Sequence, residues 1–203
     1  MTALRDLFGP SREEIWRQLS TLVHGHYVDG GFWHGDKVQA THGSWTVTLD
    51  RHVVSTGKVT IVYTRIRAPY VNPSRFRFRI YRRSLFSDLG KALGMQDIEV
   101  GDAAFDEAFI IKGNDEAKVR RLFSKIGIRG LINAQPEIEL SVKDDEGWFG
   151  PAFPHGVDEL QFLAHGVIKD LDQLKGLYQM FAEVLEELCR MGTAYDTDPH
   201  VDL

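Results

Sequence analysis

Residues 38–67 have the sequence VQATHGSWTVTLDRHVVSTGKVTIVYTRIR, in which polar residues alternate with apolar ones over long stretches. A period of two is typical of a β-strand with one buried face. The Gly43-Ser44 pair predicts a two-residue hairpin turn of type II′, because glycine readily adopts the positive φ that its first position requires. We therefore expect one strand up to His42, a return strand from Trp45 and a third strand over residues 59–67.

The next stretch, residues 75–81, alternates arginine with apolar residues and reads RFRFRIY. A fourth strand over residues 75–83 would place its arginines on one face and its aromatic residues on the other. A Pro- and Asn-containing connection at 68–74 precedes it, so four consecutive strands indicate an antiparallel meander. Pairing of the third and fourth strands would bring five arginines together: Arg65, Arg67, Arg75, Arg77 and Arg79.

Helix signals mark both ends of the chain. Ser11 and Glu14 form a capping-box pattern that predicts a first helix. A long amphipathic helix is expected from Asp170 to a cap at Gly192, because apolar residues recur there at helical spacing. Shorter elements are expected between them: helices over 85–93, 114–123 and 128–134, and strands over 97–100, 105–112, 136–143 and 159–168.

This order predicts an α+β domain with a curved, mainly antiparallel sheet, an N-terminal helix and a long C-terminal amphipathic helix. The order of elements is similar to that of pleckstrin-homology-like barrels, and this resemblance implies a barrel with one open end plugged by the last helix. We expect residues 1–203 to form a single domain, because no linker or repeat interrupts the chain, and residues 193–203 to be a frayed tail.

Composition limits the class of protein. The chain has 203 residues, of which 43% are hydrophobic and 26% charged, as expected for a globular domain. No apolar run approaches the roughly 18 residues that span a bilayer, and residues 1–10 do not resemble a signal peptide. The lone Cys189 excludes an intrachain disulfide and favours a reducing compartment, so we expect a cytoplasmic protein.

The net charge of −5 is unevenly distributed. Residues 51–91 contain ten Lys or Arg and a single acid, Asp88, so that segment carries +9 and the rest of the chain −14. The five arginines could therefore bind a phosphate or carboxylate ligand, or an acidic protein partner. Alternatively, carboxylates of the chain itself pair with them on a solvated sheet face, and we favour this interpretation. The expected partners lie in the acidic stretch Asp97, Glu99, Asp102, Asp106 and Glu107. A pI near 5.9 and the lack of a motif argue against nucleic acid.

The N-terminal third is rich in histidine and suggests an alternative. Together with Asp36 and Asp50, five histidines could supply ligands to a metal-dependent enzyme or hydrolase: His24, His26, His34, His42 and His52. Their spacing matches no metal-binding pattern, however, and the chain contains neither a phosphate-binding glycine loop nor a nucleophile elbow. We therefore expect no catalytic residue, no metal and no cofactor.

One short stretch resembles a known group of proteins. The residues Gly101-Asp102, Phe105-Asp106, Phe109 and Lys112-Gly113 form a GD-x-x-FD-x-x-F-x-x-KG pattern. The pattern is similar to that of families of uncharacterised bacterial proteins, which bring no established activity and therefore no residue role.

These observations predict a non-enzymatic binding or scaffold module. The alternative is the small metal-dependent enzyme or hydrolase described above. A third hypothesis is a homodimer formed through the long terminal helix or through a sheet edge.

Overall fold

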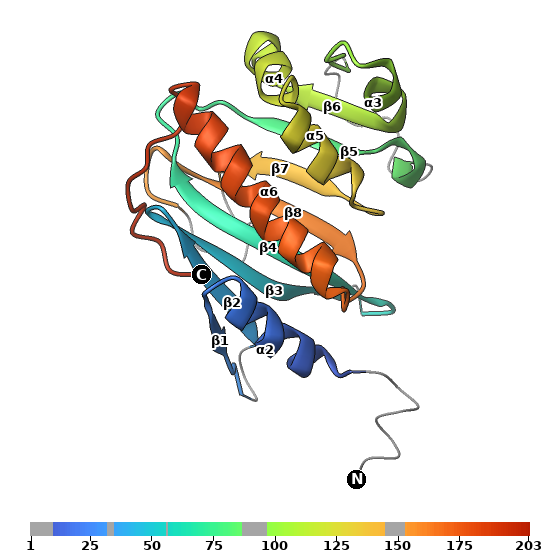
Figure 1. Ribbon diagram of the computed structural model, residues 1–203, viewed down its shortest axis with the longest axis vertical. Coiled ribbons are helices and arrows are strands. Elements are labelled where there is room, and N and C mark those ends of the chain that lie inside the picture. The colour runs from blue at the N-terminus through green and yellow to red at the C-terminus, as the bar shows by residue number, and fades with distance from the viewer. Residues whose placement is uncertain (1–9, 32–34, 56, 87–96, 145–152) are drawn as a thin grey trace.

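The computed structural model describes residues 10–31, 35–55, 57–86, 97–144 and 153–203. These residues form an α+β structure with one eight-stranded antiparallel sheet, as the sequence predicts (Figure 1). The strands are β1 (His26–Val28), β2 (Lys37–His42), β3 (Trp45–Ser55), β4 (Thr60–Val71), β5 (Phe78–Arg82), β6 (Phe109–Gly113), β7 (Glu139–Lys143) and β8 (Val157–His165). The helices are α2 (Arg12–Leu22), α3 (Ala103–Ala108), α4 (Glu116–Phe123), α5 (Ile126–Asn133) and α6 (Leu171–Arg190), with a 3₁₀ turn η1 (Arg83–Phe86).

The sheet order is β1-β2-β3-β4-β8-β7-β5-β6, which corrects the predicted meander. Strands β2, β3 and β4 follow each other as expected, but β4 does not pair with β5. It pairs with β8 over nine residues, from Tyr63↔His165 to Val71↔Val157. The strand continues through Pro69, which lies beyond the last β3 pair, Thr48↔Arg67, so the missing N–H costs no hydrogen bond to β3.

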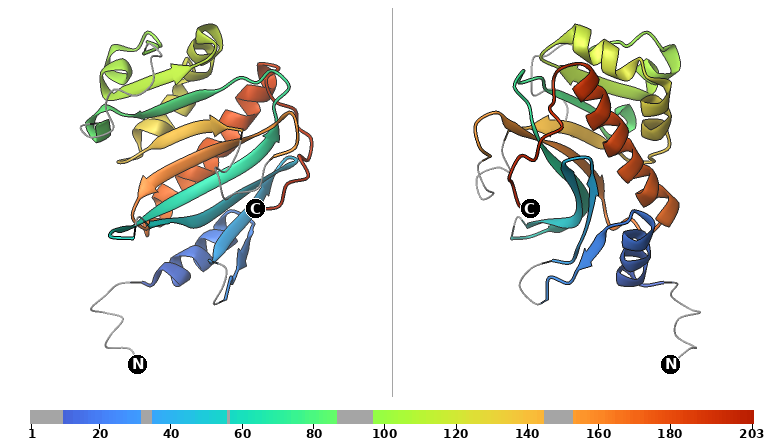
Figure 2. Two further views of the ribbon diagram at one scale, coloured as in Figure 1. Left: turned by 180° about the vertical axis from the view of Figure 1, so that it is seen from behind. Right: turned by 60° about the vertical axis from the view of Figure 1, so that its left-hand side comes forward.

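The sheet is open rather than closed into a barrel, so the expected pleckstrin-homology-like barrel is wrong. Strands β1 and β6 lie at opposite edges of the sheet. Helix α6 lies diagonally across one face of the sheet instead of plugging an open end (Figures 1 and 2). The same face is flanked by α2 at the β1–β2 end and by α4 and α5 at the β6 end.

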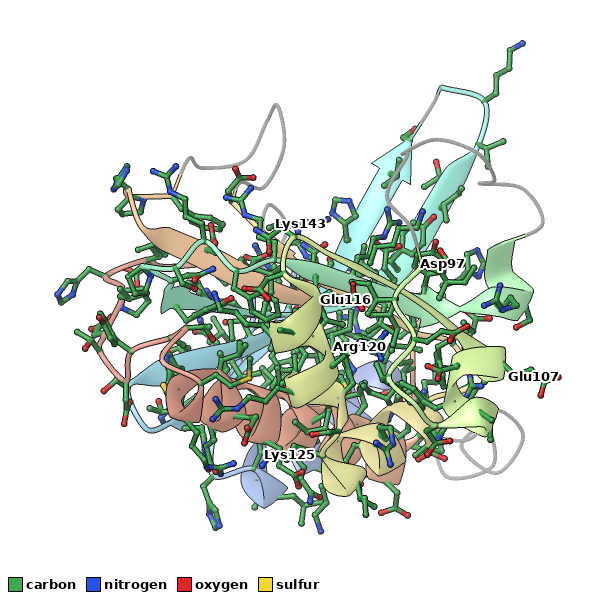
Figure 3. The ribbon with its side chains drawn as sticks, turned by 90° about the horizontal axis from the view of Figure 1, so that it is seen from above. Asp97, Glu107, Glu116, Arg120, Lys125 and Lys143 are labelled. Atoms are coloured by element: carbon green, nitrogen blue, oxygen red, sulfur yellow. The ribbon has the colours of Figure 1, made fainter. Side chains whose placement is uncertain are left out.

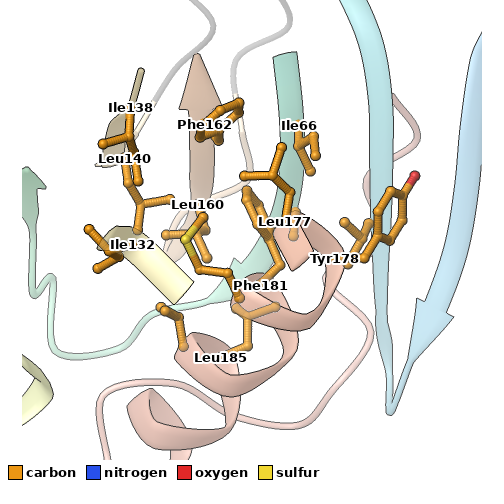
Figure 4. Close-up of a cluster of buried hydrophobic side chains, with 14 of the residues drawn as sticks. Ile66, Ile132, Ile138, Leu140, Leu160, Phe162, Leu177, Tyr178, Phe181 and Leu185 are labelled. Atoms are coloured by element: carbon orange, nitrogen blue, oxygen red, sulfur yellow. The ribbon is translucent and has the colours of Figure 1, made fainter. Parts of the chain in front are cut away.

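The hydrophobic core lies between α6 and this face of the sheet (Figure 4). Leu177, Phe181 and Leu185 of α6 are completely buried. They face apolar residues of the central strands, including Ile66, Leu160, Phe162 and Leu140. The expected caps are present: Ser11 and Glu14 form the capping box of α2, and Asp170 accepts a hydrogen bond from the backbone N–H of Gln173 at the start of α6.

The segment before β6 differs from its prediction. Residues 103–108 form α3 rather than the first half of a strand, because the side chain of Asp102 caps the helix by accepting from the N–H of Phe105. Residues 97–100 form no strand, although the N–H of Ile98 donates to the carbonyl of Ile111 in β6 (2.8 Å). The helix predicted over 85–93 lies almost entirely outside the described residues.

Residues 193–203, expected to fray, make contacts along the sheet. The N–H of Tyr195 donates to the carbonyl of Val71 (3.1 Å), and the side chain of Asp196 accepts from the N–H of Ser44 (2.8 Å). Thr193 and Ala194 are buried. The tail therefore crosses from the end of α6 to the β2–β3 hairpin (Figure 2).

Candidate functional site

The sheet face opposite α6 is polar, and we call it the polar face. Strand pairing aligns one row of polar residues across seven strands: Gln39, Thr48, Arg67, Gln161, Ser141, Arg79 and Lys112. Side chains alternate along each strand, so these residues point away from the apolar row that faces the helices. Lys143 of β7 projects on this side, whereas α6 lies on the other (Figure 3).

An ion cluster occupies the middle of the polar face. Asp50 of β3 accepts two hydrogen bonds from Arg65 of β4, from Nε and from NH2, both at 2.8 Å. It accepts a third from NH2 of Arg67 at 2.5 Å. Burial alone raises the pKa of Asp50, but the hydrogen bond from Arg65 and the charges of both arginines outweigh it and hold this pKa below its usual value. Asp50 is therefore ionised at neutral pH.

The cluster continues onto β8 and β7. Glu159 is completely buried and lies 3.9 Å from the guanidinium of Arg67. The side-chain amide of Gln161 donates to Glu159 (3.0 Å), and the ammonium of Lys143 donates to the amide oxygen of Gln161 (2.5 Å). Ionic groups buried this deeply need several polar contacts, because removal of water from a charge is costly.

A row of three rings borders the ion cluster. His52, Tyr63 and His165 face each other across β3, β4 and β8, with ring centroids 6.4 Å and 5.9 Å apart along the row. Partial burial lowers the pKa of His52, and the charge of Arg65 and that of Lys143 lower it further, against an opposing effect of Asp50. The imidazole of His52 is consequently neutral at pH 7.

The predicted arginines do not form one adjacent group. Arg65 and Arg67 lie on β4, whereas Arg79 lies on β5, with β8 and β7 between them. Arg77 immediately precedes β5, and Arg75 has a positive φ of 51° in the turn before it.

Four of the five arginines contact carboxylates of the chain, which is the interpretation that the sequence favours. Arg65 and Arg67 contact Asp50 as described. Arg79 contacts Glu139 at 3.0 Å, and Arg77 contacts Asp144 at 2.8 Å and Asp158 at 3.3 Å. Arg75 instead contacts the ring of His155 at 2.9 Å. The binding role of the five residues stays a prediction.

The acidic stretch at 97–107 does not supply these carboxylates, which corrects the expected partners. Asp102 caps α3 and contacts Arg129 (3.2 Å). Asp106 accepts from the N–H groups of Val100 and Gly101, as a turn residue does. The pairing acids come instead from β3, β7 and β8 and from the residue after β7, because strand register determines which side chains meet.

The GD-x-x-FD-x-x-F-x-x-KG residues have structural roles. Gly101 has a φ of +86°, Asp102 and Asp106 hold the turn, and Phe105 and Phe109 are buried in mutual contact. At Gly113 an added Cβ would lie 2.5 Å from the side chain of Val119, so only glycine fits there. The pattern therefore describes how α3, β6 and α4 pack.

The described histidines of the N-terminal third are dispersed. His24 follows α2, His26 lies on β1, and His42 contacts Glu186 of α6 at 3.0 Å, whereas His34 lies outside the described residues. In the part of the chain that the structure describes, no three His, Cys, Asp or Glu side chains are grouped so as to hold a metal ion. The described residues therefore provide no metal site that would support the metal-dependent enzyme.

Sequence reasoning missed the centre of the polar face. Glu159, Gln161 and Lys143 were not proposed as functional residues, and Asp50 and His52 entered only as metal ligands. A signal did exist, since Glu139, Ser141 and Lys143 alternate with apolar residues in β7. Which strands lie beside β7 could not be derived from that alternation.

Comparison with known proteins adds no family or relative: no family model, no curated protein and no solved structure matches this chain. Within the described residues, no helix combines the length and the apolar character needed to cross a membrane.

Proposed function

We propose that the chain is a non-enzymatic binding module whose polar face binds a small ligand carrying one carboxylate or phosphate group. The observation that carries this proposal is the environment of Lys143. Among the described residues its ammonium contacts an amide oxygen, that of Gln161, and no carboxylate. The nearby acids Asp50 and Glu159 contact arginines instead. An anionic group beside Lys143 would meet a cation whose charge none of the described carboxylates pairs.

The neighbouring side chains support an anion at this position. Burial is the main cause of the lowered pKa of His52, and the positive charges of Arg65 and Lys143 also act on this ring and lower its pKa, against the negative charge of Asp50. Its neutral imidazole can donate one N–H to a ligand oxygen. Both His52 and Lys143 are partly exposed, so a small molecule can reach them. Of the five predicted arginines, Arg65 and Arg67 then support the site through their contacts with Asp50.

The experiment is a calorimetric titration at low ionic strength, with inorganic phosphate and acetate as separate probes. Lys143→Gln removes the proposed charge–charge contact, and we expect the affinity for the bound probe to fall by about tenfold or more. Lys125→Gln is the matched control, because Lys125 lies on the opposite side of the sheet (Figure 3). Absence of binding of either probe, or equal binding by the two variants, would contradict the proposal.

A second readout locates the bound anion. An anion beside His52 stabilises its protonated form, so binding should raise the pKa of His52, and affinity should increase as pH falls through that titration. Proton NMR of the His52 ring with and without phosphate measures this directly. The ring signals of His42, which contacts Glu186 on the helix side, should not respond to phosphate.

We also propose a cytoplasmic location for the protein. The support is the single half-buried Cys189, which has no second cysteine to pair with.

A further inference from the structure

The β3–β4 hairpin extends beyond the rest of the sheet, and we call its described residues Arg51–Ser55 and Thr60–Val62 the arm. Pairing with β8 ends at Tyr63↔His165, and Gly166 donates a last backbone bond to Val62, so beyond Val62 the tip of the arm consists of two strands alone. It projects on the side away from α6 (Figure 3). Val53 is 51% exposed and Val54 38% exposed. Two isolated strands with exposed apolar residues are marginally stable in water, so the arm gains from a partner.

Among the residues that the structure describes, none covers the outer edge of β3 in the arm. Pairing between β2 and β3 runs from His42↔Trp45 to Val38↔Leu49. From Arg51 to Ser55, none of the described residues hydrogen-bonds to that edge. Folded proteins usually protect such an edge with proline, a bulge or charged residues, because it is a template for another strand. Here Arg51 is the single charged residue in the five positions.

The orientation of the backbone groups on this edge follows from one hydrogen bond. The N–H of Gly166 donates to the carbonyl of Val62 (2.7 Å), so Val62 directs its backbone groups toward β8 and away from β3. In an antiparallel pair, two residues that lie directly opposite either both direct their backbone groups toward each other or both direct them away. Val62 lies opposite Val53, and Val62 directs its groups away from β3. Val53 therefore directs its N–H and carbonyl outward, and so do Arg51 and Ser55, two positions away on either side.

We propose that the chain forms a two-fold symmetric dimer in which the Arg51–Ser55 edges of two copies pair as antiparallel strands centred on Val53. In this register Val53 meets Val53 of the second copy, and Arg51 meets Ser55. Every outward N–H and carbonyl of these three residues then has a partner. A second copy fits this edge because the segment is complementary to itself without placing like charges opposite each other.

Other registers fit less well. Centring the pair on Arg51 places two arginines directly opposite, which is repulsive. Centring it on Ser55 moves Val53 opposite Gly57, which lies beyond the end of β3. In the Val53 register, His52 of one copy also lies beside Val54 of the other, so the dimer covers the exposed valine side chains. The sheets of the two copies then become one continuous sheet.

The first test measures mass against concentration by sedimentation. The wild-type chain should convert from 23.1 kDa to twice that mass as concentration rises. Val53→Pro removes an outward N–H without touching the bonds between β3 and β4, and should raise the dissociation constant by at least about tenfold. Val53→Thr keeps the N–H and the β-branched shape and should dimerise normally. Thermal unfolding of both variants checks that the fold is intact.

The second test fixes the register by disulfide formation, with Cys189→Ala as background. Opposed residues of a hydrogen-bonded antiparallel pair have Cα atoms about 5.5 Å apart, which a disulfide can bridge. Val53→Cys should therefore cross-link to itself in air, whereas Ser55→Cys, whose copies would lie about 14 Å apart, should not. A chain that stays monomeric at every concentration overturns the proposal. So does a dimer that Val53→Pro leaves unchanged, or equal cross-linking at both positions.

Discussion

Two rows of residues run side by side across the same seven strands, and they are stabilised in different ways. The row facing the helices contains Val38, Leu49, Ile66, Phe162, Leu140, Ile80 and Ile111, all at most 1% exposed. The row one residue away on the polar face contains Thr48, Arg67, Gln161 and Ser141, which are at most 5% exposed. Burial is therefore nearly equal on the two faces at the centre of the sheet, although the chemistry of the side chains is opposite.

This comparison separates two kinds of stabilisation. Apolar side chains gain free energy in proportion to the area removed from water, whatever their exact neighbours. Buried charges gain only if each one meets its partner, since an unmatched charge costs several kcal/mol. The helix-side row should therefore tolerate changes that conserve volume, and the polar face should not tolerate the loss of a single charge.

The largest effect is expected on the helix side. Phe181 of α6 is completely buried against the sheet, so Phe181→Ala should lower the free energy of unfolding by about 3–5 kcal/mol. Phe181→Leu keeps most of the volume and should cost less than about 1.5 kcal/mol. Denaturant titration of both variants measures the difference. Equal losses would mean that this face depends on precise contacts as much as the polar face does.

A loss of about 2–3 kcal/mol is expected from Asp50→Asn on the polar face. The substitution changes the volume little, but leaves Arg67, which is 4% exposed, without its closest carboxylate. The pKa of Asp50 is lowered in the folded state, so its contribution is complete above the ordinary aspartate pKa near 3.9 and is lost as pH falls through the lower folded value. Unfolding measured across acidic pH should therefore become less pH-dependent in Asp50→Asn. An unchanged pH profile would show that the ion cluster does not stabilise the fold.

The smallest of the three effects, about 1–2 kcal/mol, is expected for Arg77→Glu. Arg77 is partly exposed and contacts Asp144 and the buried Asp158 at the end of the sheet. Its replacement by an acid places like charges together, with a loss that solvent reduces. Stability and polyanion binding at low salt should be measured together. If Arg77→Glu abolishes a salt-sensitive polyanion complex without loss of stability, the arginines bind anions rather than pair with carboxylates of the chain.

Local sequence signals were sufficient for most helices and for one hairpin. Ser11, Asp115 and Asp170 each cap the helix that follows them, because a cap depends on residues within one turn. The hairpin turn at Gly43 also depends on local residues alone, because its positive φ of +59° is a conformation that glycine readily adopts. The pairing of β4 with β8 has no such local signal. Both strands alternate correctly in the sequence, yet alternation says which face is buried and not which strand lies alongside.

The candidate site shows the same limit. The sequence singled out Arg65 and Arg67, and it favoured pairing of the arginines with carboxylates. It could not identify Asp50 as their partner, because fifteen residues and a hairpin separate Asp50 from Arg65. Nor could it place Lys143 beside Gln161, since that contact depends on the register of β7 against β8.

The position of β8 between β4 and β7 also affects how the chain folds. Thr64 bonds to the carbonyl of Gly166 across 102 residues of sequence, so the centre of the sheet is closed by a contact of very long range. Contacts of this kind carry a high loop-closure entropy and slow the folding of a domain. On the ribosome, the edge of β4 stays without its partner until β8 has emerged. The nascent chain therefore needs protection against aggregation during most of its synthesis, and it should fold cooperatively only when β8 and α6 are available.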